Sequence, residues 1–399
     1  MKMPDSTPRF LDVADAAPRC RILVMGVGGA GGNMVYRMAQ TWRNGPPALA
    51  VNTDAQTLAA CDGLPTLLIG EQAARGLGAS GDVTCGRLAA EESLSSLQEA
   101  LAGKDLLFLV TGLGGGTGTG AAPVIAKAAR QMGALVLAFA TLPFPFEGDR
   151  RKSQADEGLR ALQRVSDAVI CLPNERLRQT SGSQTGVQDA FRQSDTMLAS
   201  GIHAIWHLLT STGIVNLTFA DVRELAERSG GALSFGFAEG SGPARSANAL
   251  RALMESPLLE SGRLLADSQG LLINITGGPD LTLADLEGIV GQISAKARPH
   301  AHISMGAMID PVRREHLTIT VLATSTWQDD RFGVKAKGEE SPKSDRKSAT
   351  PAEAQGELAL PDTTKDRGRF VSAPATLING EDLDIPTYLR RGIKLSFER

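Results

Sequence analysis

The stretch that decides the fold is "TGLGGGTGTGAA" at residues 111–122, which is rich in glycine and threonine and contains no basic residue. It follows the apolar run "DLLFLV" at 105–110 and opens the helical pattern "AAPVIAKAAR" at 121–130. Glycine lets the backbone approach a ligand closely, and a helix that begins there directs its first N–H groups at an anion. Because the Gly-Lys-Ser/Thr of a Walker loop is missing, we expect backbone amides, the Thr117 and Thr119 hydroxyls and the helix dipole to hold phosphates, with Mg²⁺ supplying the cation.

A second glycine loop, "GVGGAGGN" at 26–33, directly follows the apolar run "RILVM" at 21–25. It fits G-x-G-x-x-G, and Asp54 follows at the end of the next apolar run. Taken alone, this pattern equally describes a Rossmann dinucleotide site. A dinucleotide fold has no use for the loop at 114–120 as well, and two similarly placed loops in one sheet argue against turns that bind nothing.

Composition limits the classes of function. The chain has 399 residues, 42% of them hydrophobic and 4% aromatic, and a net charge of −3. This charge predicts no nucleic-acid partner. The four cysteines have no CxxC spacing, which is typical of free thiols in a reducing compartment. Since no apolar run approaches the length of a membrane span and the N-terminus is polar, we expect a cytoplasmic protein without direct membrane insertion.

The pattern along the chain predicts two α/β domains and a tail. Unbroken apolar runs alternate with helical patterns up to about residue 172, as in a doubly wound parallel sheet covered on both faces. A long amphipathic helix and four further apolar runs follow, and then a segment rich in Lys, Glu, Ser and Pro. The expected organisation is a flexible arm at 1–20, a nucleotide-binding domain at 21–186, a central helix at 187–210, a second domain at 211–325, a disordered linker at 326–378 and a partner-binding peptide at 379–399.

These loops, together with "NTDAQ" at 52–56, "RGLGASGD" at 75–82 and "PFPFEGDRR" at 143–151, resemble the FtsZ family, the bacterial tubulin relatives of cell division. The resemblance runs from about residue 21 to 325 and returns at "LDIPTYLRR". It implies a tubulin/FtsZ-like α/β fold with a Rossmann-like parallel-sheet GTPase domain, a long central helix and a second α/β domain with a mixed sheet. It also implies GTP/GDP and Mg²⁺ as cofactors, head-to-tail self-assembly into filaments, and a cytoplasmic ring at the division site.

The resemblance also implies a set of nucleotide contacts. Residues 78–82 would reach the γ-phosphate and sense its loss, Glu147 and Arg151 would contact the ribose and nucleotide, and Asn174 would contact guanine. Arg151 could instead be an ordinary surface base. The full set of expected GTP contacts is Gly29, Ala30, Gly31, Gly32, Asn33, Asp54, Ala79, Ser80, Gly81, Gly116, Thr117, Gly118, Glu147, Arg151, Asn174, Phe191 and Asp195.

Phe191 and Asp195 carry a separate physical argument. Their i, i+4 spacing puts them on one face of the long helix. The ring can stack on a purine while the carboxylate accepts hydrogen bonds from guanine N1–H and the 2-amino group. Adenine lacks both donors, so the pair predicts GTP rather than ATP. The alternative for an isolated helix is a buried Phe beside a solvated Asp.

Neither glycine loop contains a general base, and the family resemblance places the hydrolytic residues elsewhere. The loop "GIVNLTFADV" at 213–222 would complete the site of the next subunit, with Asn216 and Asp221 acting in trans. Thr218 stands where the family usually has Asp, so we expect slow turnover. One alternative is a paralog that forms filaments with GTP but hydrolyses little or none of it. Another is a dinucleotide-dependent oxidoreductase.

Two further signals have weaker support. The terminal peptide resembles the family's tail for membrane tethers and division regulators, through Asp384, Ile385, Pro386, Tyr388 and Leu389; the alternative is a sticky disordered end. His203 and His207 have the i, i+4 spacing of a zinc pair, but no third ligand is evident. We therefore expect ordinary helix histidines and no metal site made by the protein alone.

Overall fold

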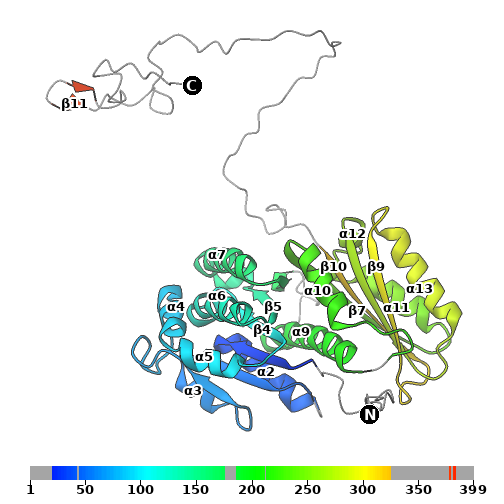
Figure 1. Ribbon diagram of the computed structural model, residues 1–399, viewed down its shortest axis with the longest axis horizontal. Coiled ribbons are helices and arrows are strands. Elements are labelled where there is room, and N and C mark those ends of the chain that lie inside the picture. The colour runs from blue at the N-terminus through cyan, green and yellow to red at the C-terminus, as the bar shows by residue number, and fades with distance from the viewer. Residues whose placement is uncertain are drawn as a thin grey trace, which may run out of the picture. The chain divides into compact units, whose positions relative to one another are not determined.

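The computed structural model describes residues 20–42, 45–175, 186–211, 213–324, 377–378 and 381–382 (Figure 1). The chain divides into two units, residues 1–335 and 336–399. In the second unit, the described residues form two short antiparallel strands, β11 (Leu377–Ile378) and β12 (Glu381–Asp382). Nearly all of the expected N-terminal arm, linker and terminal peptide, including Asp384, Ile385, Pro386, Tyr388 and Leu389, lies outside the described residues.

The first domain is built on six parallel strands, in the order β3-β2-β1-β4-β5-β6. Their bounds are Ile22–Val27 for β1, Ala48–Asn52 for β2, Thr66–Leu68 for β3, Leu106–Gly112 for β4, Leu135–Leu142 for β5 and Ala168–Pro173 for β6. Every residue of β1 and β5 is buried. Unbroken apolar strands of this kind need helices on both faces, which confirms the predicted parallel α/β class.

Helices cover both faces of this sheet (Figure 1). The helices are α2 (Gly28–Thr41), α3 (Ala55–Ala59), α4 (Val83–Glu92), α5 (Leu94–Leu101), α6 (Gly116–Gln131) and α7 (Asp149–Val165), with the 3-10 turn η1 at Pro145–Glu147. Alternate residues of β1 point to opposite faces, so Met25 packs with α4 to α7, whereas Val24 packs with α2 and the central helix. The sheet therefore separates two apolar layers.

The central helix α9 (Val187–Thr210) leads to α10 (Phe219–Arg228) and the second domain. Its strands are β7 (Gly231–Ser241), β8 (Gly270–Gly277), β9 (His302–Ile309) and β10 (His316–Thr324), and its helices are α11 (Arg245–Glu255), α12 (Arg263–Ala266) and α13 (Leu283–Lys296), with the turn η2 at Pro257–Leu259. The pairs β7–β10 and β10–β8 are antiparallel and β8–β9 is parallel, which confirms the expected mixed sheet. Within the described residues, no helix combines the length and apolar character that crossing a bilayer requires.

The two sheets are joined, a feature that the sequence pattern did not predict. Strand β7 pairs in parallel with β6 through Ala168–Gly231, Val169–Ala232 and Ile170–Leu233. This seam makes one ten-stranded sheet with the order β3-β2-β1-β4-β5-β6-β7-β10-β8-β9. The two domains therefore share a hydrogen-bonded backbone connection in addition to α9.

A charged cluster ties α11 to the start of α13. Arg245, whose side chain is 12% exposed, pairs with Asp280 and Asp285, and the Ser246 hydroxyl donates to Asp285. The Thr282 hydroxyl also donates to Asp285 at 2.8 Å, at the N-terminus of α13. Although burial raises it, the pKa of Asp285 is lowered to about 2 by the hydrogen bonds from Ser246, Thr282 and Arg245.

This cluster predicts a pH-dependent contribution to stability. Since the folded pKa of Asp285 lies below its ordinary value, the carboxylate stabilises the fold above about pH 4, and this stabilisation is lost as the pH falls toward about 2. We expect Asp285→Asn to lower the free energy of unfolding by about 1 kcal/mol at neutral pH, through loss of a charged cap. The deficit should shrink as urea unfolding is repeated toward pH 2. The exposed Glu287→Gln on the same helix is the control, and a deficit that is constant with pH would contradict the assignment.

Candidate nucleotide-binding site

A cavity of about 470 Å³ lies where the carboxyl ends of β1, β2, β4 and β5 meet the N-termini of α2 and α6. Its volume is in the range of small-molecule sites. The structure brings most of the expected contacts together here. The expected residues that line it are Gly29, Ala30, Asp54, Ala79, Ser80, Gly81, Gly116, Thr117, Gly118, Glu147, Arg151, Asn174 and Phe191.

Four expected contacts do not line this cavity. Gly31 and Gly32 are buried in α2, and Asn33 is exposed on the same helix. A Cβ on Gly31 would lie 2.3 Å from the Val110 carbonyl oxygen, so Gly31 allows α2 to pack against β4. Asp195 lines a different cavity, described below. Direct contact of these four residues with a nucleotide stays a prediction.

The two glycine loops touch each other at the floor of the site. Gly28 has a φ of +74°, and a Cβ there would lie 2.8 Å from the backbone nitrogen of Gly118. The helices that start at these loops, α2 and α6, have no side-chain hydrogen bond at their N-caps, Val27 and Gly115. Their first N–H groups are therefore not satisfied by a cap and remain available to an anion.

The two threonine hydroxyls of the second loop are used within the protein. The Thr117 hydroxyl lies 2.6 Å from that of Thr53, and both side chains are buried. The Thr119 hydroxyl accepts a hydrogen bond from the Gly114 N–H at 2.8 Å, and Thr119 does not line the cavity. Thr119 therefore stabilises the conformation of the loop from the side that faces away from the cavity. Thr117, in contrast, lines the cavity, and its hydroxyl is bonded to that of Thr53.

Three charged residues line the described part of the cavity: Asp54, Glu147 and Arg151. Asp54 caps α3, and hydrogen bonds from the Thr57 hydroxyl and backbone lower the pKa of its carboxyl. The Glu147 carboxylate pairs with Arg151 at 2.7 Å. Because Glu147 pairs with Arg151, the described lining residues offer no unpaired cationic side chain to a polyphosphate.

The opposite side of the cavity can receive a planar base. The Ser194 hydroxyl on α9 donates to Asn174 at 2.8 Å, and both side chains are buried, so the Asn174 amide is held in place. Phe191 is 37% exposed and packs edge-on against Phe144, with ring centroids 5.0 Å apart. Phe144 in turn stacks on Phe146 at 5.2 Å. The motif "PFPFEGD" contained this aromatic support, which the sequence analysis did not use.

The residues predicted to act on the next subunit lie in the second domain. The Asn216 side chain accepts from the Gly213 N–H at 2.6 Å, and the loop pairs with Ala307 of β9. The Asp221 carboxylate accepts from the Thr218 N–H at 2.7 Å and from the Thr218 hydroxyl at 2.6 Å. Neither Asn216 nor Asp221 is among the described residues that line the cavity.

Further lining residues were not singled out by the sequence analysis. Most of them lie in motifs that it quoted, and the usable signal was their position at or just after the carboxyl ends of β2, β3, β4 and β5. These residues are Asn52, Thr57, Leu77, Gly112, Leu113, Gly114, Gly115, Thr141, Leu142 and Pro143.

The histidine pair lies in an aromatic cluster on α9. The His203 ring is 5.2 Å from Trp42, 5.5 Å from Trp206 and 5.9 Å from His207. Burial lowers the pKa of both histidines. Among the described residues, no group of three or more His, Cys, Asp and Glu side chains could hold a metal ion.

Comparisons with known proteins agree with this geometry. The profile of the Tubulin/FtsZ family, GTPase domain, matches residues 21–182, and that of the FtsZ family, C-terminal domain, matches residues 230–326. The chain is 38% identical to the cell division protein FtsZ of Pseudomonas aeruginosa, over 95% of this chain and 98% of that protein.

Solved structures show the same fold. An empty FtsZ dimer of M. jannaschii superposes with a TM-score of 0.71 at 35% identity, over 77% of this chain and 88% of that chain. A GTPγS-bound protofilament of CetZ2 from Haloferax volcanii, at 24% identity and a TM-score of 0.65 over 78% and 95% of the two chains, shares the fold. By its family profiles and its curated relatives, the chain belongs to the FtsZ family of tubulin-like GTPases.

Proposed function

We propose that this protein binds GTP with Mg²⁺, assembles head to tail into filaments that form the cytoplasmic division ring, and hydrolyses GTP at the contact between subunits. The observation that carries the proposal is the contact of two glycine loops at two helix N-termini, in a family of GTPases. This arrangement offers backbone donors to a polyphosphate. Family membership removes the oxidoreductase alternative.

The cavity supports an assignment of roles within the nucleotide. Gly29 and Gly115 line the cavity and have open space where a Cβ would stand, so their backbone would face the phosphates. The lining carboxylates of Asp54 and Glu147 already have protein partners. Mg²⁺ would therefore be held mainly by phosphate oxygens and water, and it supplies charge neutralisation that the described lining residues do not.

Hydrolysis in trans is supported by the engagement of both lining carboxylates. With Asp54 used as a helix cap and Glu147 paired with Arg151, neither is placed to orient a water. Asn216 and Asp221 belong to the second domain and would act on the nucleotide of the next subunit.

Exposed apolar side chains support self-association. Leu77 is 81% exposed beside the nucleotide cavity, and Phe146 is 64% exposed in the turn before α7. On the second domain, Ile214 is 69% exposed and lies in the loop that pairs with β9. Val312, which follows β9, is 90% exposed. A head-to-tail contact would bury Leu77 and Phe146 of one subunit against Ile214 and Val312 of the next.

Two finer roles complete the proposal. Residues 78–82 would sense the γ-phosphate, since Ser80 and Gly81 both have left-handed backbones in a loop that Gln154 holds by a hydrogen bond to the Gly81 carbonyl. The terminal peptide with Asp384, Ile385, Pro386, Tyr388 and Leu389 would bind membrane tethers and division regulators.

Thr218 favours a second candidate, a paralog that binds GTP and forms filaments with little hydrolysis. Its hydroxyl and N–H both engage Asp221, which holds that carboxylate within its own helix cap. Where the family usually has a second carboxylate, this chain has a hydrogen-bond donor. Asp221 is then the single acidic group of this loop.

The first prediction concerns assembly. We expect the full chain to sediment with GTP and Mg²⁺ but not with ATP, and the GTP turnover per chain to rise with protein concentration, because each site needs a neighbour. Phosphate release measured over a dilution series checks this. A turnover per chain that is unaffected by dilution would contradict hydrolysis in trans.

The second prediction concerns the contact of the two loops. Gly28→Ala adds a methyl group against the Gly118 amide, so we expect GTP affinity to fall by at least about tenfold, the loss of a phosphate hydrogen bond. Gly63→Ala is a matched control, because Gly63 has a similar φ of +76° but open space around it. Binding of a fluorescent guanine nucleotide distinguishes the two. Equal affinities of the two variants for the nucleotide would refute the proposal that the two glycine loops bind its phosphates.

The third prediction concerns Thr218. Restoring a carboxylate by Thr218→Asp should raise the GTP turnover of filaments by about tenfold or more, the usual size of one such group. Asp is also a good N-cap, so α10 should be retained. Thr210→Asp adds the same charge at the exposed end of α9 and should change nothing. If Thr218→Asp brings no gain, the slow-turnover hypothesis is wrong.

A further inference from the structure

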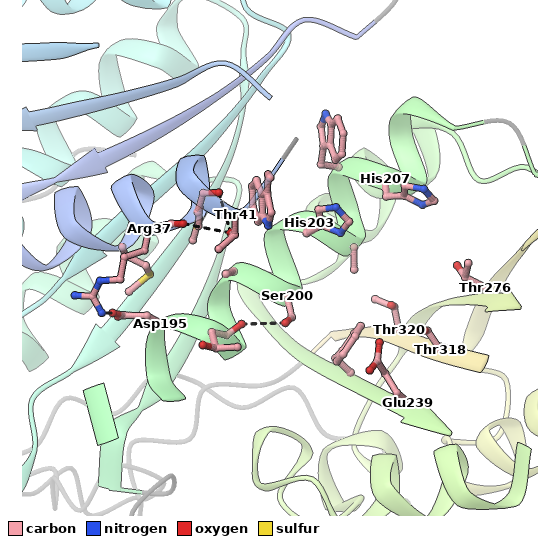
Figure 2. A pocket seen from close by; sticks show the side chains of 18 of the residues that line it. Arg37, Thr41, Asp195, Ser200, His203, His207, Glu239, Thr276, Thr318 and Thr320 are labelled. Carbon is pink, nitrogen blue, oxygen red and sulfur yellow. Dashed lines mark hydrogen bonds and ion pairs between the residues drawn. The ribbon is translucent and has the colours of Figure 1, made fainter. Parts of the chain in front are cut away.

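A second cavity, of about 920 Å³, lies between α2, α9 and strands β7, β8 and β10 (Figure 2). Figure 2 shows Arg37 of α2 and Asp195 of α9 pointing toward each other along its wall. The Arg37 guanidinium donates to Oδ2 of Asp195. No described residue donates a hydrogen bond to Oδ1.

Asp195 is close along α9 to residues that face the nucleotide cavity. Phe191, one turn earlier, lines that cavity. Ser194, the preceding residue, holds Asn174, which also lines it. The Asp195 carboxylate therefore lies at the boundary of the two cavities, with one oxygen held from the α2 side.

The charge of Asp195 depends on Arg37. The Asp195 side chain is 16% exposed. Burial raises its pKa to about 6, and the charge and hydrogen bond of Arg37 oppose this by lowering the pKa. The other charged or titratable side chains that line the second cavity are Arg192, His203 and His207 on α9, Glu239 on β7, and Asp310 and Arg313 after β9. Within the described part of the chain, Arg37 is the charged group that lowers the pKa of Asp195.

We propose that Arg37 is a specificity-determining positioning residue: it keeps Asp195 a carboxylate, so that Asp195 reads guanine and rejects adenine. The inference rests on the proposed function. An ionised Asp195 accepts from guanine N1–H and the 2-amino group, and it opposes the lone pair of adenine N1. A protonated Asp195 reverses this preference, because its O–H meets guanine N1–H donor to donor and can donate to adenine N1. Arg37 thereby controls base choice without touching the base.

The test is the pH dependence of base selectivity in Arg37→Gln. GTP and ATP compete against a fluorescent guanine nucleotide on the full chain with Mg²⁺, at about pH 7 and about pH 8.5. The parent should prefer GTP at both values. In Arg37→Gln the GTP-to-ATP preference should fall by about tenfold near pH 7, the loss of one charge-assisted hydrogen bond, and largely recover near pH 8.5.

Three further variants separate charge from structure. Arg37→Lys keeps the charge and should behave as the parent does. Asp195→Asn should show low selectivity at both pH values, and adding Arg37→Gln to it should have no further effect. Arg192→Gln, which removes a cation of the same cavity that pairs with Asp189, should leave the selectivity unchanged. If Arg37→Gln does not fold, Arg37→Met, which keeps the apolar stem, replaces it.

Two results would overturn the inference. One is an Arg37→Gln variant with the selectivity of the parent at both pH values. The other is an equal loss at both pH values, which would mean that Arg37 acts by packing alone. A parent chain that binds GTP and ATP alike would overturn the proposed function, and this inference with it, so the two failures can be told apart.

Discussion

The structure of the site depends on the contact between the two glycine loops at Gly28 and Gly118. A single methyl group at Gly28 would meet the Gly118 amide, so the loops can meet only as bare backbone. Because they meet, the uncapped N-termini of α2 and α6 converge on one cavity. In our proposal, the positive end of each helix takes the place of the lysine that other phosphate loops use. On this proposal, the affinity of the site for phosphate would come from backbone geometry rather than from side-chain charge.

In our proposal, the residues that bind the nucleotide differ from those that hydrolyse it. The described lining of the cavity contains two carboxylates, and both have structural partners: Asp54 caps α3, and Glu147 pairs with Arg151. A water-orienting group has to come from elsewhere, and in our proposal it comes from the loop before α10 on a neighbouring copy. Hydrolysis is then coupled to assembly because the described residues of the cavity include no free carboxylate that could orient a water. Thr218 lies in that same loop, where its N–H and hydroxyl both donate to the Asp221 carboxylate.

Much of the fold could be predicted from the sequence because its signals are local. Unbroken apolar runs marked the buried parallel strands, and glycines after β1 and β4 marked the two loops. The remaining features depend on residues far apart in the chain. Asp195 is 158 residues from Arg37, so its ion pair leaves no local pattern. Thr117 and Thr119 look equivalent in sequence, yet the loop turns Thr119 away from the cavity. The pairing of β6 with β7 likewise joins segments that are far apart in the chain, so no local pattern predicts it.

The seam between β6 and β7 also has a mechanical meaning. Its three residue pairs run along the strand direction and join the nucleotide-binding domain to the second domain beside α9. Tension along a filament would cross each subunit through this seam and the helix together. Bending of a filament should therefore be concentrated at the joints between subunits, while the continuous sheet inside each subunit stays stiff.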